Sequence, residues 1–324
     1  MHLLLIANTV ASSVTDRRLG EVERRLATGH DLDIVTTTHR GHATEIAAAA
    51  VSRGIGAVVV LGGDGTLNEA ANALVGTDRI LAPLPGGSTN VFARSIGLPR
   101  DVADAASVTA AALGRGSVER IGVGEVTADG GPPRAFLCHT GIGWDAALVS
   151  EVERRREGAR RRATIPLFTR AGLHAFTKGY DRRNPQFSVG PFADDRSDDD
   201  RVITDGRFAL VMNSDPYTFL GRRPFRVAPA ADRHSGLAVV TMSNLNTPTF
   251  LRTVLQALGG RGIHPGRGTD VRSGITALSV DRLASATGEV HYQVDGDHLG
   301  AFEHLAFRYR PAALDVINPS GAAP

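Results

Sequence analysis

Cysteine and lysine are almost absent from this chain of 324 residues, which holds one of each, Cys138 and Lys178. A single cysteine excludes an intrachain disulfide and a cysteine-based zinc site, which favours a reducing compartment. The formal net charge of +2 is too small to indicate a nucleic-acid partner by itself. With lysine nearly missing, the basic residues are almost all arginine, and we infer no function from their number.

Long apolar runs are absent as well. No stretch approaches the roughly 20 residues of a membrane-spanning helix, and the short apolar start at residues 1–8 lacks the basic flank of a signal peptide. Hydrophobic residues still make up 42% of the chain, enough for one large or two ordinary globular domains. We therefore expect a soluble, cytoplasmic protein that is at most peripheral to a membrane.

The most informative stretch is residues 57–69, which read AVVVLGGDGTLNE. Its apolar start is typical of a buried parallel strand, and its glycines indicate a tight turn before a helix that runs from Thr66 to Val75. Amide groups that converge at a helix N-terminus bind anions, so phosphate is the expected ligand. Asp64 within such a loop points to a divalent metal. Because Asp-Gly is also ordinary turn chemistry, this loop alone leaves the function open.

A second loop of the same kind follows at residues 81–94, which read LAPLPGGSTNVFAR. Ser88 and Thr89 can donate hydroxyls there. Arg94, one helical turn past Asn90, can bind phosphate or form a surface salt bridge. Two such loops at the ends of successive strands form one crevice.

Together the two loops resemble the diacylglycerol kinase catalytic domain, whose superfamily includes sphingosine kinases and NAD kinases. The resemblance implies ATP and Mg²⁺ as cofactors, with Asp64 as the metal ligand. It also implies a nucleotide contact from Asn8 and Ser12, and a position near the adenine for Thr37. The expected nucleotide-binding residues are Asn8, Ser12, Thr37, Gly62, Gly63, Asp64, Gly65, Thr66, Asn68, Gly87, Ser88, Thr89, Asn90 and Arg94.

The order of strand and helix patterns predicts the fold. Alternating strands and helices predict a doubly wound α/β domain over residues 1–122. Short apolar runs separated by turns then predict an antiparallel, β-sandwich-like domain over 123–310, interrupted by helices at 145–156 and 248–258. By resemblance, 311–318 return to the first domain, and 319–324 form a tail.

The second domain is expected to carry the acceptor chemistry. Residues 292–300, YQVDGDHLG, present Asp295 and Asp297 on a turn that resembles the family segment with the acceptor-activating carboxylate. Repulsion between two carboxylates suits a general base, although Asp-Gly is also an ordinary hairpin turn. Which aspartate acts stays open. Lys178 resembles a lysine that assists catalysis, while His139 and Trp144, in a family glycine segment, are expected to be structural.

Some features depart from the family. Val91 and Gly122 stand where bacterial diacylglycerol kinases carry acids that help hold magnesium, and Asp232 alone remains of a second metal loop. Two charged runs also need an interpretation. Residues 153–162 favour a salt-bridged helix end over a site for anionic lipid, and residues 194–200 favour an exposed loop over a cation site.

We therefore expect an ATP-dependent lipid kinase that phosphorylates diacylglycerol or a related lipid at the membrane surface. An NAD kinase and a non-catalytic nucleotide- or lipid-binding regulator are the alternatives. A homodimer is left open, and no nucleic-acid partner is expected.

Overall fold

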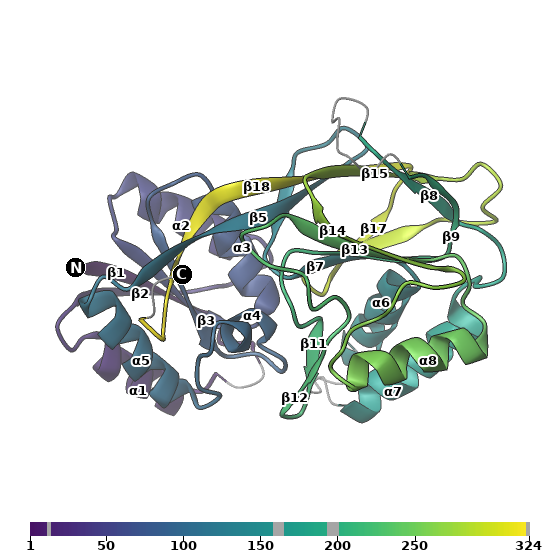
Figure 1. Ribbon diagram of the computed structural model, residues 1–324. Coiled ribbons are helices and arrows are strands. Elements are labelled where there is room, and N and C mark those ends of the chain that lie inside the picture. Colours follow the sequence, from purple (N-terminus) through teal and green to yellow (C-terminus); the bar gives the residue numbers. More distant parts are fainter. Residues whose placement is uncertain (12–13, 158–164, 193–200, 322–324) are drawn as a thin grey trace. The chain divides into compact units, whose positions relative to one another are not determined.

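The computed structural model describes residues 1–11, 14–157, 165–192 and 201–321. The chain divides into two compact units: Met1–Gly122 with Ala312–Pro324, and Val123–Pro311. Two long strands, β5 (Val118–Ala128) and β18 (His304–Ile317), each contribute residues to both units (Figure 1). The predicted fold class, an α/β domain followed by an antiparallel β domain, is confirmed.

The first unit is built on a parallel sheet with the strand order β2-β1-β3-β4, and the end of β18 pairs in parallel with β4. This order brings the carboxyl ends of β1, β3 and β4 to one edge of the sheet, where the loops of interest begin. The elements are β1 (His2–Ala7), α1 (Asp16–Leu26), β2 (Asp31–Thr36), α2 (His42–Ser52), β3 (Ala57–Gly62), α3 (Asp64–Leu74), β4 (Ile80–Pro85), α4 (Val91–Ser95) and α5 (Val102–Gly114).

Helices cover both faces of this sheet, which explains why its central strand is apolar throughout. Every residue of β3 is buried. Helices α1 and α5 pack on one face, and α2 and α3 lie on the other (Figure 1). Side-chain caps start the first pair: the Thr15 side chain accepts from the Arg18 amide, and Asp101 accepts from Ala103 and Asp104. In α2 and α3 the N-cap residue is a glycine, which has no side chain to accept from the first amides of the helix.

The second unit contains two large sheets, a two-stranded sheet of β11 and β12, and a group of helices. One sheet has the antiparallel order β14-β13-β10-β7-β16-β17, and in the other β15 pairs with β18 and β8, and β8 with β9. The elements are β6 (Arg134–Phe136), β7 (His139–Gly143), α6 (Trp144–Glu157), α7 (Ile165–His174), η1 (Ala175–Gly179), β8 (Phe187–Gly190), β9 (Ile203–Gly206), β10 (Phe208–Met212), β11 (Thr218–Leu220), β12 (Arg223–Phe225), β13 (Leu237–Met242), α8 (Thr247–Leu258), β14 (Thr269–Ile275), β15 (Ala277–Arg282), β16 (His291–Val294) and β17 (Asp297–Ala301).

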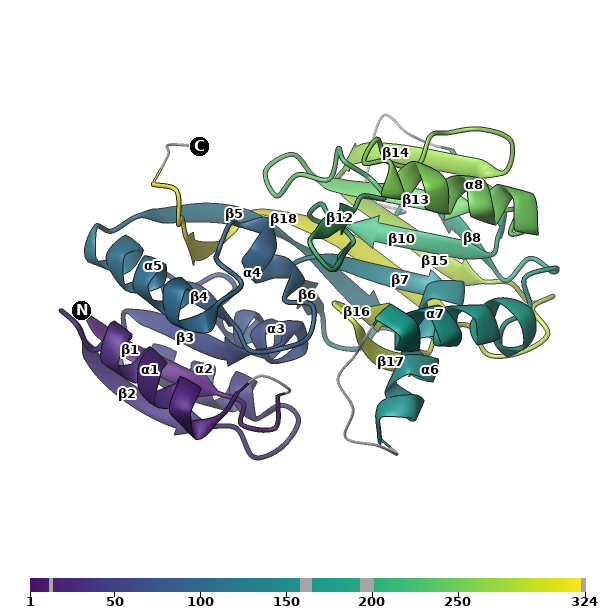
Figure 2. The ribbon, with the colours of Figure 1, turned by 90° about the horizontal axis from the view of Figure 1, so that it is seen from below.

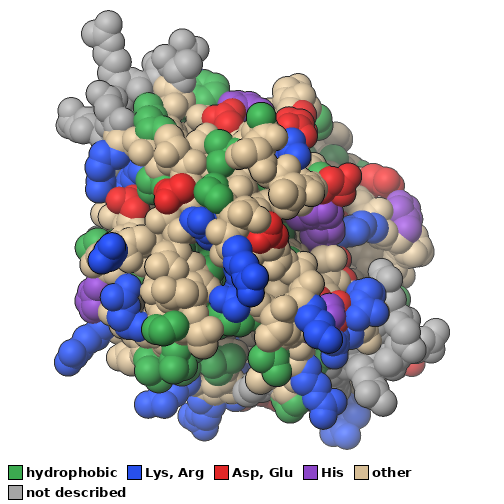
Figure 3. Space-filling model, turned by 90° about the vertical axis from the view of Figure 1, so that its right-hand side faces the viewer, with side chains coloured by type: hydrophobic (Ala, Val, Ile, Leu, Met, Phe, Trp, Pro, Cys, Tyr) green, Lys and Arg blue, Asp and Glu red, His purple; other side chains and the backbone are tan. Residues whose placement is uncertain are grey.

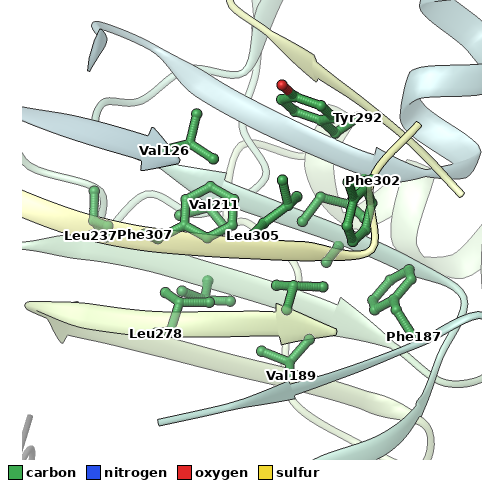
Figure 4. Close-up of a cluster of buried hydrophobic side chains, with 14 of the residues drawn as sticks. Val126, Phe187, Val189, Val211, Leu237, Leu278, Tyr292, Phe302, Leu305 and Phe307 are labelled. Atoms are coloured by element: carbon green, nitrogen blue, oxygen red, sulfur yellow. The ribbon is translucent and has the colours of Figure 1, made fainter. Parts of the chain in front are cut away.

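Strand β10 shows how this unit is held together, because all five of its residues are buried. Ala209 and Val211 belong to the core between the two sheets, which Figure 4 shows with Phe187, Tyr292 and Phe307. The alternate residues of β10 pack instead with Trp144 and the other side chains of the helical layer. Figure 2 shows α6, α7 and α8 together on that side of the sheet. A strand with apolar layers on both faces carries no polar alternation.

The helix α7 and the π-helical turn η1 were not predicted from the sequence. Among the side chains that the structure describes there, Ala171, Ala175 and Phe176 are buried. Phe176 packs on Phe250, with 4.5 Å between the ring centroids, which fastens η1 to α8. None of the helices in the described part of the chain has the length and apolar character needed to cross a membrane.

Half of the charged run 153–162 and all of the run 194–200 lie outside the described residues, which omit 158–164 and 193–200. Just before the first run, Glu151 accepts hydrogen bonds from Arg154 and Arg155, which belong to it. These ion pairs, one turn apart, lower the pKa of Glu151 to about 2. They are the local pairing expected of a salt-bridged helix end.

Candidate functional site

The two glycine turns of the first unit lie against each other, backbone to backbone. The Gly86 amide donates to the Gly62 carbonyl at 2.9 Å. A Cβ on Gly87 would stand 2.6 Å from Gly63 Cα, and one on Gly86 would stand 2.8 Å from the Gly62 nitrogen. These glycines are therefore required so that the two turns can pack together. Gly65 differs, since a Cβ there would meet nothing within 4 Å.

Asp64 joins the two turns through its carboxylate. One oxygen, Oδ2, accepts from Thr89 Oγ1 at 3.1 Å and from the Val91 amide at 3.0 Å, while Oδ1 accepts from the Phe92 amide at 3.2 Å. The carboxylate thus caps the N-terminus of α4, whose own N-cap residue Asn90 gives no side-chain cap. Burial raises the pKa of Asp64, and these donors partly oppose the rise.

The N-terminus of α3 remains without a side-chain cap. Its first helical hydrogen bond runs from the Leu67 amide to the Gly63 carbonyl, so the amides of Asp64, Gly65 and Thr66 precede the helical ladder. By contrast, Glu69 closes the start of α2, where its carboxylate accepts from the Gly41 and Ala43 amides. Among these helix starts, α3 is the one whose geometry suits an anion above Gly65.

Other predicted residues hold these loops in place. Asn8 Nδ2 donates to Thr66 Oγ1 at 2.9 Å. Asn90, with φ 49°, accepts from the Gly87 amide and donates to the Gly87 carbonyl, which closes the second turn. The Thr37 amide extends the pairing of β1 and β2 by donating to the Ala7 carbonyl.

The remaining predicted nucleotide residues differ in exposure. Ser88 is exposed and Arg94 is half-buried. Burial and then Arg100 lower the pKa of Arg94, while the Asp64 carboxylate raises it, which places the guanidinium within the electrostatic reach of Asp64. Asn68 is only 1% exposed and is bonded to Asn72, so its predicted nucleotide contact stays a prediction that this geometry does not support. Ser12 lies outside the described residues.

One carboxylate, Asp64, fits a magnesium ion in this unit. Among the described residues, no group of three or more His, Cys, Asp or Glu side chains is placed to hold a metal. Mg²⁺ usually takes one or two carboxylates and completes its shell with phosphate oxygens and water. Thr89, Val91, Phe92 and the Asp64 amide already donate to this carboxylate, so a magnesium ion would share it with these donors.

In the second unit, the structure distinguishes the two candidate bases. Asp295, with φ 48° and 7% exposure, directs its carboxylate at three backbone amides. Oδ2 accepts from Leu137 at 2.8 Å, and Oδ1 accepts from Cys138 and His139 at 2.9 Å each. Asp295 thereby fastens the β16–β17 turn to the segment that leads into β7.

Asp297 is the more accessible of the two. Its side chain is 14% exposed, and Oδ2 accepts from Arg134 Nη2 at 2.8 Å. No sequence signal marked Arg134, which lies 163 positions away.

A buried polar network beneath this turn was also missed by sequence analysis. Asp145 accepts from the Tyr217 hydroxyl at 2.6 Å and from Gln293 Nε2 at 2.8 Å, and Gln293 Oε1 accepts from the Gly296 amide at 2.7 Å. The one sequence signal for it is Gly141, where a Cβ would stand 1.7 Å from the Asp145 carboxylate. The network connects the start of α6 to the turn that carries Asp297.

We expect Asp145→Asn to remove a pH dependence of stability. Burial raises the pKa of Asp145 from 3.8 to about 6, so its contribution to stability is fully present below pH 3.8 and is lost as the pH rises through 6. That difference corresponds to about 3 kcal/mol. In urea unfolding from pH 4 to 7.5, the free energy of unfolding of the variant should therefore rise relative to that of the wild type as the pH rises. Two parallel curves would show that Asp145 does not titrate as described.

Other predicted residues of this unit have clear environments. His139 is buried, which lowers its pKa to about 3, and its ring lies 4.5 Å from that of Tyr217. Trp144 packs on Phe250 in the helical layer. Both environments are those of structural side chains. Lys178 is exposed at the end of η1, a π-helical turn of the kind often found at functional sites.

Comparison with known proteins agrees with the geometry of the first unit. Residues 2–126 match the model of the diacylglycerol kinase catalytic domain. The diacylglycerol kinase of Mycobacterium tuberculosis strain ATCC 25618 / H37Rv is 28% identical over 312 residues, which cover 93% of this chain and 89% of that protein. The diacylglycerol kinase of Bacillus subtilis strain 168 is 40% identical over 75 residues, 22% of this chain and 25% of that protein.

The fold is shared with a solved structure over the full length. The crystal structure of a diacylglycerol kinase from Bacillus anthracis str. Sterne superposes with a TM-score of 0.68 at 18% identity, covering 99% of this chain and 98% of that one. At that identity the likeness concerns the fold alone. The resemblance that the two glycine loops predicted is confirmed.

Proposed function

We propose that this chain, whose residues 2–126 match the model of the diacylglycerol kinase catalytic domain, is an ATP-dependent lipid kinase. It transfers the γ-phosphate of ATP to the hydroxyl of diacylglycerol or a related lipid, giving phosphatidic acid or its equivalent. The observation that carries this proposal is the pair of interlocked glycine turns, which leaves the α3 amides available for phosphate beside the Asp64 carboxylate.

The first unit binds the nucleotide in this proposal. The amides of Gly65 and Thr66 hold phosphate oxygens, and Arg94 adds positive charge near them. Asp64 would hold Mg²⁺, which when bound neutralises charge on the β- and γ-phosphates. The same carboxylate caps α4, so the position of the metal ligand is fixed by the loops that it joins.

The second unit supplies the base. The acceptor hydroxyl oxygen forms a bond to the γ-phosphorus, the bond from that phosphorus to the β–γ bridging oxygen breaks, and ADP leaves. Asp297 takes the hydroxyl proton, with Arg134 orienting its carboxylate. Asp295 and the Asp145–Gln293 network hold the turn on which Asp297 stands. In this proposal Lys178 assists at the reacting phosphate.

Gly65 gives a sharp test of the phosphate cradle. Because the space around it is open, Gly65→Ala should raise stability by up to about 1 kcal/mol. The added methyl group would stand over the α3 amides, so ATP should bind at least about tenfold more weakly in calorimetry. Gly87→Ala is the control: its methyl group meets Gly63, and a loss of about 1–3 kcal/mol is expected. Unchanged ATP affinity in Gly65→Ala would place the nucleotide elsewhere.

The function itself is tested by mixing the protein with [γ-³²P]ATP, Mg²⁺ and micelles of diacylglycerol, sphingosine or ceramide, with NAD in a parallel tube. Label on a lipid supports the proposal and identifies the acceptor. Label on NAD alone would replace it with an NAD kinase. ATP binding without transfer to any acceptor would favour a non-catalytic regulator, and Val91 and Gly122, in place of acids, would be the reason.

Because the acceptor is a lipid, we further propose that the protein works in the cytoplasm at the inner face of the membrane as a peripheral protein. Nothing in this proposal requires a span, and the contact would be made by surface side chains.

A further inference from the structure

Helix α8 carries leucines on the side that it does not bury. Thr253 and Ala257 face the core, and Phe250 packs on Trp144 and Phe176. Leu251 and Leu255 are 56% and 59% exposed. Four residues apart, they lie one above the other on one side of the helix. Of the six large hydrophobic side chains exposed within the described residues, this one helix holds two.

The charged residues of the segment that carries these leucines have one sign. From Asn244 to Thr269 the sequence contains Arg252, Arg261, Arg267 and His264, and no aspartate or glutamate. All three arginines are exposed. Figure 3 looks at the side of the second unit toward which α7 and α8 lie in Figure 1. Hydrophobic and basic side chains gather in its lower part, where acidic ones are sparse.

We propose that this α8 surface, made of Leu251, Arg252, Leu255, Arg261 and Arg267, docks on a bilayer that contains anionic lipids. Exposed leucines enter the boundary between headgroups and acyl chains, while arginines meet lipid phosphates. The charge argues against a second copy of the chain as the occupant, because two such surfaces would repel each other. The physiological purpose, delivery to a lipid substrate, rests on the proposed function.

The test is sedimentation of the full chain with sucrose-loaded vesicles of phosphatidylcholine and phosphatidylglycerol that contain no diacylglycerol. Wild type should bind these vesicles, bind pure phosphatidylcholine much less, and be released by salt. Leu251→Glu and Leu255→Glu should each weaken binding roughly tenfold. Replacing each arginine by glutamine should weaken it about fivefold.

Val202→Glu is the matched control, because Val202 is 58% exposed in the same unit but lies outside α8. It makes the same change of charge and should leave vesicle binding within about twofold of wild type. Glutamate is a good helix former, so the α8 variants should melt like wild type by circular dichroism. The proposal would be overturned if Leu251→Glu, Leu255→Glu and Val202→Glu bound the anionic vesicles equally well. It would also be overturned if wild type bound neutral and anionic vesicles equally well.

Two further outcomes separate this inference from the enzyme assignment. Turnover of water-soluble, short-chain diacylglycerol should survive Leu251→Glu, whereas turnover of diacylglycerol in vesicles should fall with binding. If wild type phosphorylates no lipid yet binds vesicles through α8, the function fails and the docking surface stands. If wild type ignores vesicles and Leu251→Glu halves its mass in gel filtration, the surface is a contact between copies and the proposal is wrong.

Discussion

Asp297→Asn should reduce lipid phosphorylation by about 10²–10⁴-fold while leaving ATP affinity unchanged. In the proposed function Asp297 accepts the proton of the acceptor hydroxyl, and removal of a general base costs about that much. The fold should survive, because asparagine can still accept from Arg134 and a single ion pair that is open to solvent contributes about 1 kcal/mol. The measurements are kcat with a micellar lipid, ATP binding by calorimetry and unfolding in urea.

Asp295→Asn is the matched control on the same turn. The Asp295 carboxylate accepts from three amides, and an asparagine would turn its own NH₂ group toward one or more of those donors. We expect a loss of about 2–4 kcal/mol in unfolding free energy. Any activity loss should follow the unfolded fraction. If Asp295→Asn is stable and inactive while Asp297→Asn stays active, the two roles are reversed.

Asp64→Asn should impair both the fold and the chemistry. The asparagine amide has only one oxygen, so it cannot accept all three hydrogen bonds that the carboxylate accepts. We expect the free energy of unfolding to fall by about 1–2 kcal/mol through the weakened α4 cap, which thermal and urea unfolding will measure. In the proposed function the same change removes the charge that faces Mg²⁺. The apparent affinity for Mg²⁺ and kcat should therefore fall by about tenfold or more, a loss that saturating Mg²⁺ partly restores.

Glu69→Gln separates the two effects, because Glu69 does for α2 what Asp64 does for α4. Its carboxylate accepts from the Gly41 and Ala43 amides, so the stability loss should be similar, about 1–2 kcal/mol. No metal role is proposed for Glu69, and its Mg²⁺ dependence should equal that of wild type. If both variants show the same Mg²⁺ dependence, Asp64 is a structural cap and the metal lies elsewhere.

The contacts of Asp64, together with the metal role proposed for it, bear on the acids that this chain lacks at Val91 and Gly122. Val91 contributes its amide to the Asp64 carboxylate, and this contact requires no acidic side chain. A metal held by one protein carboxylate depends more on phosphate and water than one held by several. In the proposed enzyme, Mg²⁺ would therefore bind with ATP, and Mg²⁺ affinity without nucleotide should be weak.

Much of the first unit was predictable, because its signals are local. Strand β3 is an uninterrupted apolar run, and the glycine turns after β3 and β4 stand directly before helices. Such patterns depend on a few neighbouring residues, so they identify the strands, the turns and the resemblance of the two glycine loops to a known catalytic domain.

The amino-acid sequence by itself determined the fold class, the similarity of residues 2–126 to the diacylglycerol kinase catalytic domain and the loops that carry Asp64, Asp295 and Asp297. Tertiary structure alone decided which groups each of these side chains contacts. Asp295 and Asp297 are two positions apart, yet one is fixed by the amides before β7 and the other faces Arg134. Those partners lie about 160 positions away along the chain. Contacts over that separation are set by the pairing of strands in a sheet, which the local sequence pattern does not predict.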